Sequence, residues 1–297
     1  MHLVRFLDPA GGPPRPGVLQ DSEVHAVAGA PTLASLLRRP LGELRRVAEA
    51  ALEAPGVRDP QLLAPIDGLT EVWGAGVTYE VSKTARVEET QQQTRTVYEQ
   101  VYDAERPELF FKSVAWRVVT TGEPIAVRAD SPNNVPEPEL AVVANADAEI
   151  VGFTVCNDLT ARAIEGQNPL YLPQAKLFSG STALAPGIRP VWEVPDPSAL
   201  EVRMVIRRAG APAWEGTTPT SRIRRRLQDL VDVLFSGDWY PDGLVLSTGT
   251  GLVPPLTFTI EPGDQVEIEV PSVGLLRNPV LLGKDGHRRL TERGGER

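Results

Sequence analysis

Two apolar runs separated by a short polar turn constrain the fold of this chain more than any other feature. Residues 141–144 (Ala-Val-Val-Ala) and 150–153 (Ile-Val-Gly-Phe) flank an Asn-Ala-Asp segment at residues 145–147. Asn and Asp favour tight turns, and a turn between two apolar runs is typical of a β-hairpin. Residues 137–139 (Glu-Pro-Glu) are predicted to be extended, because proline lacks a backbone donor and disfavours helix for the residue before it. The sequence therefore predicts two paired strands with acidic residues at their open end.

Three carboxylates are expected to converge at that open end. In an extended chain residues i and i+2 project from the same face, so Glu137 and Glu139 lie side by side. Asp158 ends the second strand, and the hairpin folds that end back beside the glutamates. Carboxylates crowded near a dry interior repel each other and lose hydration, at a cost of roughly several kcal/mol unless a cation joins them. We therefore predict a site for a hard divalent ion, Mg²⁺ or Mn²⁺, held by Glu137, Glu139 and Asp158.

Simpler interpretations exist for each of these acidic residues taken alone. At an exposed strand edge, Glu137 and Glu139 would serve only solubility. Asp158, preceded by Asn157, could cap a helix or form an Asx-turn. Neither interpretation explains why the hairpin returns Asp158 to the two glutamates.

The chain divides into a small first part and a larger second part. Residues 1–66 contain a strand-like start, Gly/Pro-rich loops and two helical stretches, of which the second carries Leu41, Leu44, Ala48 and Ala51 on one face. We predict a small N-terminal α/β domain over residues 1–66 and a β-rich domain over residues 67–297. The fold class is α+β.

Within the larger part, period-2 patterns predict strands and two segments predict helices. A buried strand is expected at residues 72–77, and half-buried strands are expected at residues 202–206 and 266–270. Residues 86–104 have the pattern of a polar amphipathic helix, and a second helix is expected over residues 221–235.

Charge and cysteine content exclude several classes of protein. The 297 residues carry a net charge of −9, which disfavours binding to nucleic acid or to anionic membranes. The basic run at residues 222–226 is interpreted as a solvated helix face or an ion-pair network. The start has no continuous apolar stretch, and no run approaches 18 apolar residues, so neither export nor membrane insertion is expected. The single Cys156 fits a reducing, cytoplasmic compartment and is expected to be a buried structural thiol.

Further motifs extend the pattern around the three carboxylates. They comprise Glu137-x-Glu139-Leu140, residues 157–162 (Asn-Asp-Leu-Thr-Ala-Arg), Lys176, residues 247–251 (Ser-Thr-Gly-Thr-Gly), 76–79 (Gly-Val-Thr-Tyr), 110–112 (Phe-Phe-Lys) and 274–279 (Gly-Leu-Leu-Arg-Asn-Pro). In this order and spacing they resemble the fumarylacetoacetate hydrolase superfamily over about residues 70–281. The first 66 residues carry little of the resemblance.

The resemblance implies a fumarylacetoacetase-like mixed β-sandwich roll for the catalytic domain, and usually a homodimer or higher homo-oligomer. It implies Mg²⁺, with Mn²⁺ as an alternative, held by Glu137, Glu139 and Asp158. It also implies a small 2-oxo acid substrate that chelates the metal, with Lys176 beside the developing negative charge.

Five residues are expected to contact or organise the substrate: Tyr79, Ser82, Lys112, Arg162 and Thr250. Arg162 would either hold the substrate carboxylate or brace the glutamates, and Lys112 would brace the site by pairing with a carboxylate. Thr250 lies in a Gly-Thr-Gly turn that offers a hydroxyl and N–H groups to an anion, although the glycines could simply make the turn.

Residues 164–176 and 248–254 resemble, more narrowly, the 2-keto-3-deoxy-pentonate dehydratases of this superfamily. Carbon–carbon hydrolases of the superfamily generally activate water with a histidine three residues after the tyrosine of the Gly-x-x-Tyr segment. Here that position is Ser82, and a serine hydroxyl cannot replace imidazole as a general base near neutral pH. We therefore expect a dehydratase of the cytoplasm, with a C–C hydrolase or decarboxylase of acylpyruvates or oxaloacetate as the alternative. A non-catalytic binding protein is disfavoured because the carboxylates and Lys176 are all retained.

The dehydration requires proton transfer at C3 and at the leaving C4 hydroxyl. Lys176 is expected to stabilise the enolate or to transfer the C3 proton, and Glu165 is expected to be the acid for the leaving hydroxyl. Lys176 could instead serve only as a structural ion-pair partner, and Glu165 could lie in a solvated loop. Residues 80–106 are predicted to form a lid over the substrate.

Overall fold

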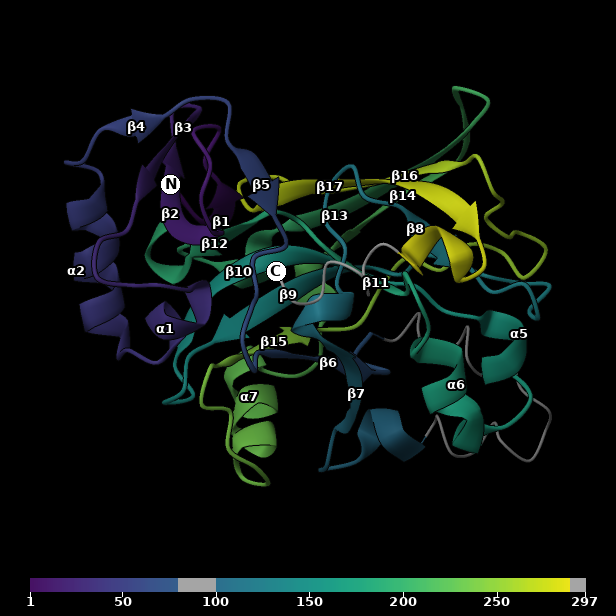
Figure 1. Ribbon diagram of the computed structural model, residues 1–297. Coiled ribbons are helices and arrows are strands. Elements are labelled where there is room, and N and C mark those ends of the chain that lie inside the picture. Colours follow the sequence, from purple (N-terminus) through teal and green to yellow (C-terminus); the bar gives the residue numbers. More distant parts are fainter. Residues whose placement is uncertain (80–99, 289–297) are drawn as a thin grey trace.

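In the computed structural model, which describes residues 1–79 and 100–288, two mixed β-sheets stack on each other with few helices around them (Figure 1). The larger sheet has the strand order β4-β3-β2-β1-β12-β10-β9-β15-β6-β7, with β11 beside β10 and β5 beside β1. The smaller sheet has the order β14-β13-β16-β17-β8. Most neighbouring strands are antiparallel, whereas β15 and β6, and β17 and β8, are parallel. The expected mixed-sheet α+β architecture is confirmed.

The strands of the larger sheet are β1 (His2–Leu7), β2 (Arg15–Gln20), β3 (Glu23–Ala26), β4 (Gly56–Val57), β5 (Gln61–Leu63), β6 (Glu71–Gly76), β7 (Glu108–Val114), β9 (Pro138–Ala144), β10 (Ile150–Asp158), β11 (Thr182–Leu184), β12 (Gly187–Pro190) and β15 (Leu244–Ser247). Those of the smaller sheet are β8 (Ile125–Val127), β13 (Glu201–Arg208), β14 (Ala211–Pro219), β16 (Gln265–Val270) and β17 (Gly274–Leu282). The α-helices are α1 (Leu33–Leu37), α2 (Leu41–Ala51), α5 (Arg162–Glu165), α6 (Leu172–Lys176) and α7 (Leu227–Phe235). Short 3-10 helices include η5 (Thr220–Arg222) and η6 (Asp285–His287).

Each face of the larger sheet packs on its own apolar core. Between the sheets, Val142 and Phe153 pack with side chains of the smaller sheet such as Met204 and Ile268. On the opposite face, Val143 belongs to a second core that also contains residues of α1 and α2. Figure 1 shows these two helices at the left, whereas α5 and α6 lie at the right. The two cores fix β9 and β10 in place, and these strands carry the predicted site.

The N-terminal strands continue the sheet that carries the site. Leu3 of β1 pairs with Ile188 of β12, and β12 in turn pairs with β10. Leu3 of β1 and the leucines of α1 share a core with Val143 and Val245. Sheet and core are therefore continuous across residue 66.

Most strand and helix predictions are confirmed. The hairpin forms as β9 and β10, with Glu139 opposite Cys156. Residues 72–76 of the expected buried strand form part of β6, and the two half-buried strands appear as β13 and β16. The second N-terminal helix is α2, with Leu44, Ala48 and Ala51 buried. These patterns are local, so the sequence alone was sufficient for them.

The predicted start of the 221–235 helix is wrong. Residues 220–222 form the 3-10 turn η5, and α7 begins only at Leu227 after an extended Arg226. Arg224 donates to the Tyr102 carbonyl, and Arg225 donates to the carbonyls of Val101 and Ala104. These contacts with a distant segment hold the arginines outside the helix.

The predicted helix over residues 86–104 and the predicted lid fall mostly on residues 80–99, outside the described part of the chain. Residues 100–103 are helical. Among the helices described, at residues 1–79 and 100–288, none combines the length and the apolar character needed to cross a bilayer.

Candidate metal centre

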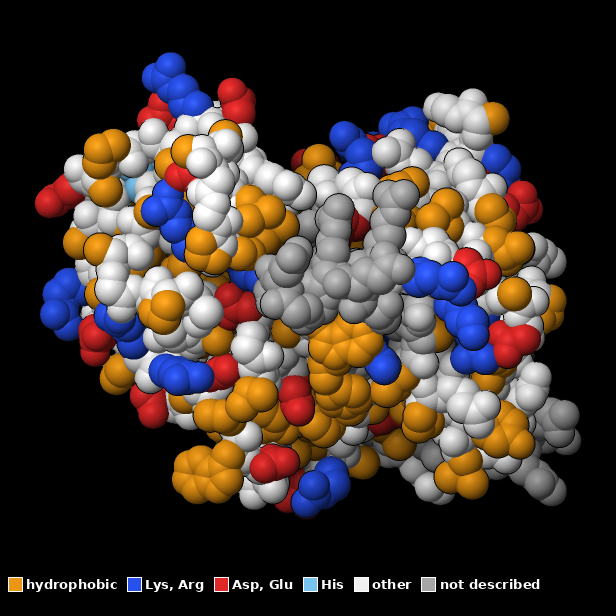
Figure 2. All heavy atoms as spheres, in the orientation of Figure 1, with side chains coloured by type: hydrophobic (Ala, Val, Ile, Leu, Met, Phe, Trp, Pro, Cys, Tyr) orange, Lys and Arg blue, Asp and Glu red, His pale blue; other side chains and the backbone are white. Residues whose placement is uncertain are grey.

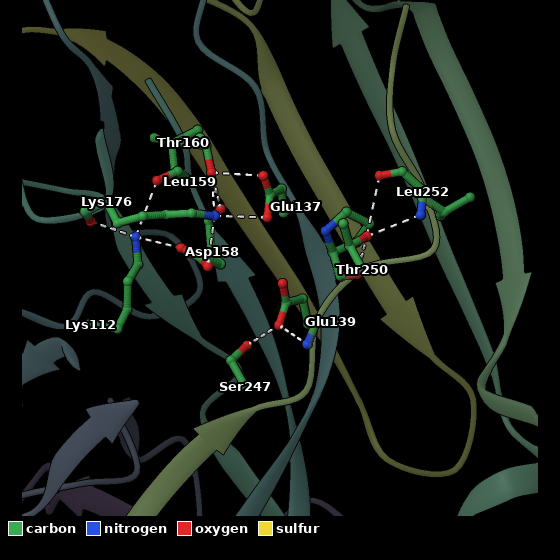
Figure 3. A network of polar contacts seen from close by, with 12 residues as sticks. Lys112, Glu137, Glu139, Asp158, Leu159, Thr160, Lys176, Ser247, Thr250 and Leu252 are labelled. Carbon is green, nitrogen blue, oxygen red and sulfur yellow. Dashed lines mark hydrogen bonds and ion pairs between the residues drawn. The ribbon is translucent and has the colours of Figure 1, made fainter. Parts of the chain in front are cut away.

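The β9–β10 hairpin brings the three predicted carboxylates together. The Asp158 N–H donates to the Glu137 carbonyl over 3.0 Å, which fixes the end of β10 beside the residue that precedes β9. One carboxylate oxygen from each of Glu137, Glu139 and Asp158 lies within 4.8 Å of the others. Figure 3 shows the three side chains facing a common space. The predicted convergence is therefore present in the structure.

Glu139 is buried and held from β15. Its Oε2 accepts hydrogen bonds of 2.6 Å from the Ser247 hydroxyl and from the Gly249 N–H. Gly249 has φ +85°, and a Cβ there would lie 2.1 Å from Thr78 Oγ1, so glycine is required at this position. Burial, followed by the charges of Asp158 and Glu137, raises the pKa of Glu139 to about 8. The two neighbouring carboxylates thus add to the effect of burial and further disfavour the ionised form of Glu139.

Two buried lysines hold Asp158 in its ionised form. Asp158 Oδ1 pairs with Lys112 Nζ at 2.5 Å, and Oδ2 pairs with Lys176 Nζ at 2.9 Å. Burial alone would raise the pKa of Asp158, but the charges of Lys112 and Lys176 outweigh burial and lower it. Lys112 Nζ also donates to the carbonyls of Leu159 and Lys176, which ties β7 to the strand end and to α6. Desolvation lowers the pKa of Lys112.

Lys176 projects from the end of α6 into the middle of the carboxylates. Its ammonium donates to Glu137 Oε2 at 2.8 Å, to Asp158 Oδ2 at 2.9 Å and to Thr160 Oγ1 at 2.7 Å. An ammonium has three N–H donors and no acceptor, so these three bonds use all its hydrogens. The ring of Phe110 lies 5.6 Å from Nζ. Lys176 is therefore placed as a fixed positive charge.

The centre has a donor set suited to a hard cation. Three carboxylates face two lysines, so the centre carries one net negative charge when all five groups are ionised. All three candidate ligands offer oxygen, the donor that Mg²⁺ and Mn²⁺ prefer. The convergence of three carboxylate oxygens within 4.8 Å of one another is the observation that most favours a bound cation, since a cation would relieve their mutual repulsion.

A protein-family model described as fumarylacetoacetate (FAA) hydrolase C-terminal matches residues 71–281, which include every group of this centre. The chain belongs to the fumarylacetoacetate hydrolase family.

Two relatives within this family are dehydratases by name. The 2-dehydro-3-deoxy-D-arabinonate dehydratase of Saccharolobus solfataricus is 40% identical over 234 residues, 78% of this chain and 78% of that protein. The probable 2-keto-3-deoxyxylonate dehydratase of Haloferax volcanii is 43% identical over 222 residues, 75% of each chain.

Solved structures of the family share the fold. A 2-keto-3-deoxy-D-arabinonate dehydratase complexed with magnesium and 2,5-dioxopentanoate has a TM-score of 0.80 and 34% identity, covering 95% of this chain and 99% of that one. A maleylpyruvate hydrolase from Sphingobium sp. SYK-6 has a TM-score of 0.69 at 16% identity, covering 95% of this chain and all of the other. The second likeness concerns the fold alone.

Three of the residues expected to contact or organise the substrate, Thr250, Arg162 and Tyr79, are buried in the structure. Thr250 Oγ1 donates to the carbonyl of Pro138, between the two glutamates. Arg162 is buried and donates to the carbonyls of Pro254 and Pro255. Tyr79 is buried against Gly251, and burial together with the charge of Glu139 raises its pKa. These contacts give Thr250 and Arg162 a backbone-bracing geometry.

Glu165 and Ser82 are less closely connected to the centre. Glu165 is buried on α5, which packs against the α6 helix that carries Lys176. Ser82 lies outside the described residues.

Two hydroxyls of the centre were given no role from the sequence. Thr160 Oγ1 donates to Glu137 Oε1 over 2.8 Å and accepts from Lys176, and Ser247 Oγ donates to Glu139. Both lie inside motifs that carry the family resemblance. The spacing of Thr160 two residues after Asp158 was the available signal, because in extended chain it shares the carboxylate's face.

Proposed function

We propose that this chain is a Mg²⁺-dependent dehydratase that converts a 2-keto-3-deoxy-pentonate to 2,5-dioxopentanoate and water. The observation that carries the proposal is the three-carboxylate centre with Lys176 seated in it, in a chain 40% identical to a named dehydratase across 78% of both. The alternative metal is Mn²⁺, which accepts the same oxygen donors.

The histidines support a dehydratase over a hydrolase. His2 is bonded to the Val273 carbonyl and His25 to the Ala54 carbonyl, both outside the centre. The remaining His287 is buried in η6. None of the three lies in the motifs that form the centre, so the water-activating imidazole of a C–C hydrolase has no counterpart there.

Glu137, Glu139 and Asp158 would hold the ion. When bound, Mg²⁺ supplies Lewis-acid stabilisation of negative charge on the 2-oxo oxygen of the substrate. Lys112 keeps Asp158 ionised and oriented, and Ser247 and the Gly249 N–H keep Glu139 oriented.

Lys176 would stabilise the enolate that forms when C3 loses a proton. Its ammonium already donates three hydrogen bonds, and an ammonium without a lone pair cannot accept the C3 proton. Of the two roles considered for this residue, enolate stabilisation therefore fits the geometry better. Glu165 would protonate the C4 hydroxyl as it leaves.

Tyr79, Ser82, Lys112, Arg162 and Thr250 are proposed as the residues that contact or organise the substrate. The contacts of Arg162 and Thr250 support this, because they hold the segment at residues 250–255 against Arg162 and against the carbonyl of Pro138 between the two glutamates.

A turnover assay separates this proposal from its main rival. The purified chain is incubated with Mg²⁺ and 2-keto-3-deoxy-D-arabinonate, 2-keto-3-deoxy-D-xylonate, an acylpyruvate or oxaloacetate in parallel. Formation of 2,5-dioxopentanoate from a deoxy-pentonate, abolished by EDTA, supports the dehydratase. Release of pyruvate from acylpyruvate or oxaloacetate, with no turnover of either deoxy-pentonate, would instead establish a hydrolase or decarboxylase.

We also infer that the chain forms a homodimer or a higher homo-oligomer. Figure 2 shows hydrophobic side chains gathered on the lower half of one face. The exposed apolar residues Leu69, Trp116 and Trp239 line one cavity of about 710 Å³. A large exposed aromatic such as Trp239, with 89% exposure, favours a protein contact. Light scattering should give a molecular mass that is a multiple of the chain mass of 32.2 kDa, and Trp239→Glu should lower the measured mass.

The cytoplasm is the proposed location, supported by a single buried cysteine. Finding the dehydratase activity in the membrane fraction or the exported fraction of fractionated cells would contradict it.

The division into a small domain at 1–66 and a catalytic domain at 67–297 also remains a proposal, supported by the family match that begins at residue 71. Limited proteolysis should cut first near that boundary.

A further inference from the structure

The basic run at residues 222–226 binds the end of a helix that lies far earlier in the chain. Residues 100–103 are helical, and the last carbonyls of a helix have no partners within it. The Arg225 guanidinium donates to three carbonyls at and just after this end over 2.7 to 3.2 Å, those of Val101, Ala104 and Glu105. Arg225 therefore caps the helix end, as basic side chains commonly do.

Arg224 adds a second set of contacts to the same helix end. Its Nη1 donates to the Tyr102 carbonyl over 2.9 Å, and its guanidinium pairs with the Asp103 carboxylate. The guanidinium carbon also lies 4.7 Å from the centre of the Tyr102 ring. The next residue, Arg226, differs: its side chain is 82% exposed and lies 3.8 Å from Asp229 of α7. The contacts of the run are therefore selective.

The backbone of the same run binds the chain on the other side of residues 80–99. The Arg224 N–H donates to the Thr78 carbonyl over 3.1 Å. Between η5 and α7, Ile223 and Arg226 have extended backbones, so no helix orients this stretch. The stretch thus meets both residue 78 and the helix end at residues 100–105.

The η5 turn gives the two arginines a fixed base. Thr220 is buried, and its hydroxyl donates to the Pro197 carbonyl over 2.8 Å and accepts from the Leu200 N–H over 3.0 Å. After the arginines, α7 buries Leu230 and Val231 in the core between the two sheets. The run is therefore attached to the body of the protein at both of its ends.

The turn that Arg224 contacts is strained. Val77 has φ +51°, a left-handed conformation that a β-branched side chain disfavours. Such a conformation persists only where its surroundings hold it. Thr78 is held on two sides, because its hydroxyl donates to the Thr248 carbonyl over 2.6 Å and its carbonyl accepts from Arg224.

This turn borders the metal centre. Thr248 is followed by Gly249, whose N–H donates to Glu139 Oε2. Tyr79, at the end of the turn, is buried, and its ring fills the space that a side chain at Gly251 would need. Burial, followed by the charge of Glu139, raises the pKa of Tyr79, so this side chain lies within electrostatic range of the centre.

We propose that Arg224 and Arg225 are positioning residues for substrate binding, an assignment that rests on the proposed dehydratase function. They join the helix end at residues 100–105 to the turn at residues 77–79, and they keep that turn in its strained conformation beside the metal centre. The arginines act through the turn rather than by contact with the substrate. Loss of either guanidinium lets the turn relax, and part of the binding free energy of a 2-oxo acid is then spent on ordering it.

Calorimetry with Mg²⁺-loaded protein and 2-oxopentanoate measures this binding without turnover, because the acid has no C4 hydroxyl to eliminate. Arg224→Met and Arg225→Met should each weaken binding of the acid at least roughly tenfold. The matched control Arg226→Met should bind the acid like the wild type. The affinity for Mg²⁺ should stay unchanged in all three variants, because Ser247 and Lys112 still hold the carboxylates.

Three further measurements separate positioning from a merely structural role. Arg225→Lys keeps the charge but not the planar fork, and should restore part of the affinity for 2-oxopentanoate. With 2-keto-3-deoxy-D-arabinonate, Arg225→Met should raise KM at least roughly tenfold and change kcat less than about twofold. Asp103→Asn cuts the ion pair from the helix side, so it should weaken binding of 2-oxopentanoate, with little further loss when combined with Arg224→Met.

The outcomes distinguish the positioning role from the proposed function. Unchanged affinity for 2-oxopentanoate in Arg224→Met and Arg225→Met would overturn the assignment, even if the wild type dehydrates deoxy-pentonates. Equal weakening in Arg226→Met, or loss of Mg²⁺ binding in Arg225→Met, would also overturn it. Weaker binding of the acid in Arg224→Met and Arg225→Met, with no dehydration by the wild type, would support the positioning role and overturn the proposed function. A wild type that binds no 2-oxopentanoate would overturn the assignment.

Discussion

The crowded carboxylates make a specific prediction about the metal-free protein. Glu139→Gln should remove one of three repelling anions while keeping an oxygen that accepts from Ser247 and Gly249. Folding raises the pKa of Glu139 from its model value of 4.5 to about 8. The folded state therefore binds more protons than the unfolded state between these values, and the free energy of unfolding falls as pH rises through this window.

The size of this change in the free energy of unfolding follows from the pKa shift of Glu139. Each pKa unit corresponds to about 1.36 kcal/mol, so between pH 5 and pH 8 Glu139 should lower the free energy of unfolding by roughly 3 to 4 kcal/mol. The buried Asp158, whose pKa is lowered, loses its contribution only in more acidic solution. The pKa of Lys112 is also lowered, so its contribution to the free energy of unfolding rises as the solution becomes alkaline, opposite to the contribution of Glu139. Subtracting the free energy of unfolding of Glu139→Gln from that of the wild type at each pH isolates the contribution of Glu139.

Urea unfolding in EDTA measures this difference at pH 5, 6, 7 and 8, with Glu105→Gln as an exposed carboxylate control. Relative to the wild type, Glu139→Gln should gain stability steadily as pH rises, and Glu105→Gln should not. When Mg²⁺ replaces EDTA at a concentration 100 times its dissociation constant, it should raise the free energy of unfolding of the wild type by about 2.7 kcal/mol. It should also make that free energy depend less on pH. A difference between wild type and Glu139→Gln that is constant with pH would refute the raised pKa that burial and the neighbouring carboxylates give to Glu139.

Three further predictions concern neighbours of the centre. Lys112→Met should lower the free energy of unfolding by about 3–5 kcal/mol, because it leaves the buried Asp158 with one cation instead of two; an unchanged urea midpoint would contradict this. Thr160→Val removes the hydroxyl that joins Glu137 to Lys176 and should lower kcat roughly tenfold with little change in KM, measured by steady-state kinetics. The thiol of Cys156, buried and with a raised pKa, should not react with a thiol reagent until urea unfolds the protein. Rapid labelling in native buffer would show that the strand opens.

The part of the site that the sequence predicts is the part built by local structure. Extended backbone around Pro138 and a short turn at residues 145–147 were sufficient to place Asp158 beside Glu137. The role of Lys176 required the family resemblance, because it lies on a separate helix and meets the carboxylates only through tertiary packing.

The remaining parts depend on long-range strand pairing that no local pattern contains. Ser247 reaches Glu139 because β15 pairs with β9, 108 residues apart in sequence at this hydrogen bond. The orientation of Lys112 depends on a bulge in β7, where the pairing with β6 changes register. The start of α7 was misplaced for the same reason, since Arg224 and Arg225 are held by a distant segment.

Glu137, Glu139 and Asp158 are proposed to form one divalent-metal centre. Isothermal titration of Mg²⁺, repeated with Mn²⁺ by electron paramagnetic resonance, tests it most directly in the wild type, Glu137→Gln, Glu139→Gln, Asp158→Asn and Glu105→Gln. We expect one bound ion per chain in the wild type and in Glu105→Gln. In each of the other three variants we expect at least roughly tenfold weaker binding, equivalent to about 1.4 kcal/mol. Unchanged affinity in Glu137→Gln, Glu139→Gln and Asp158→Asn would contradict it.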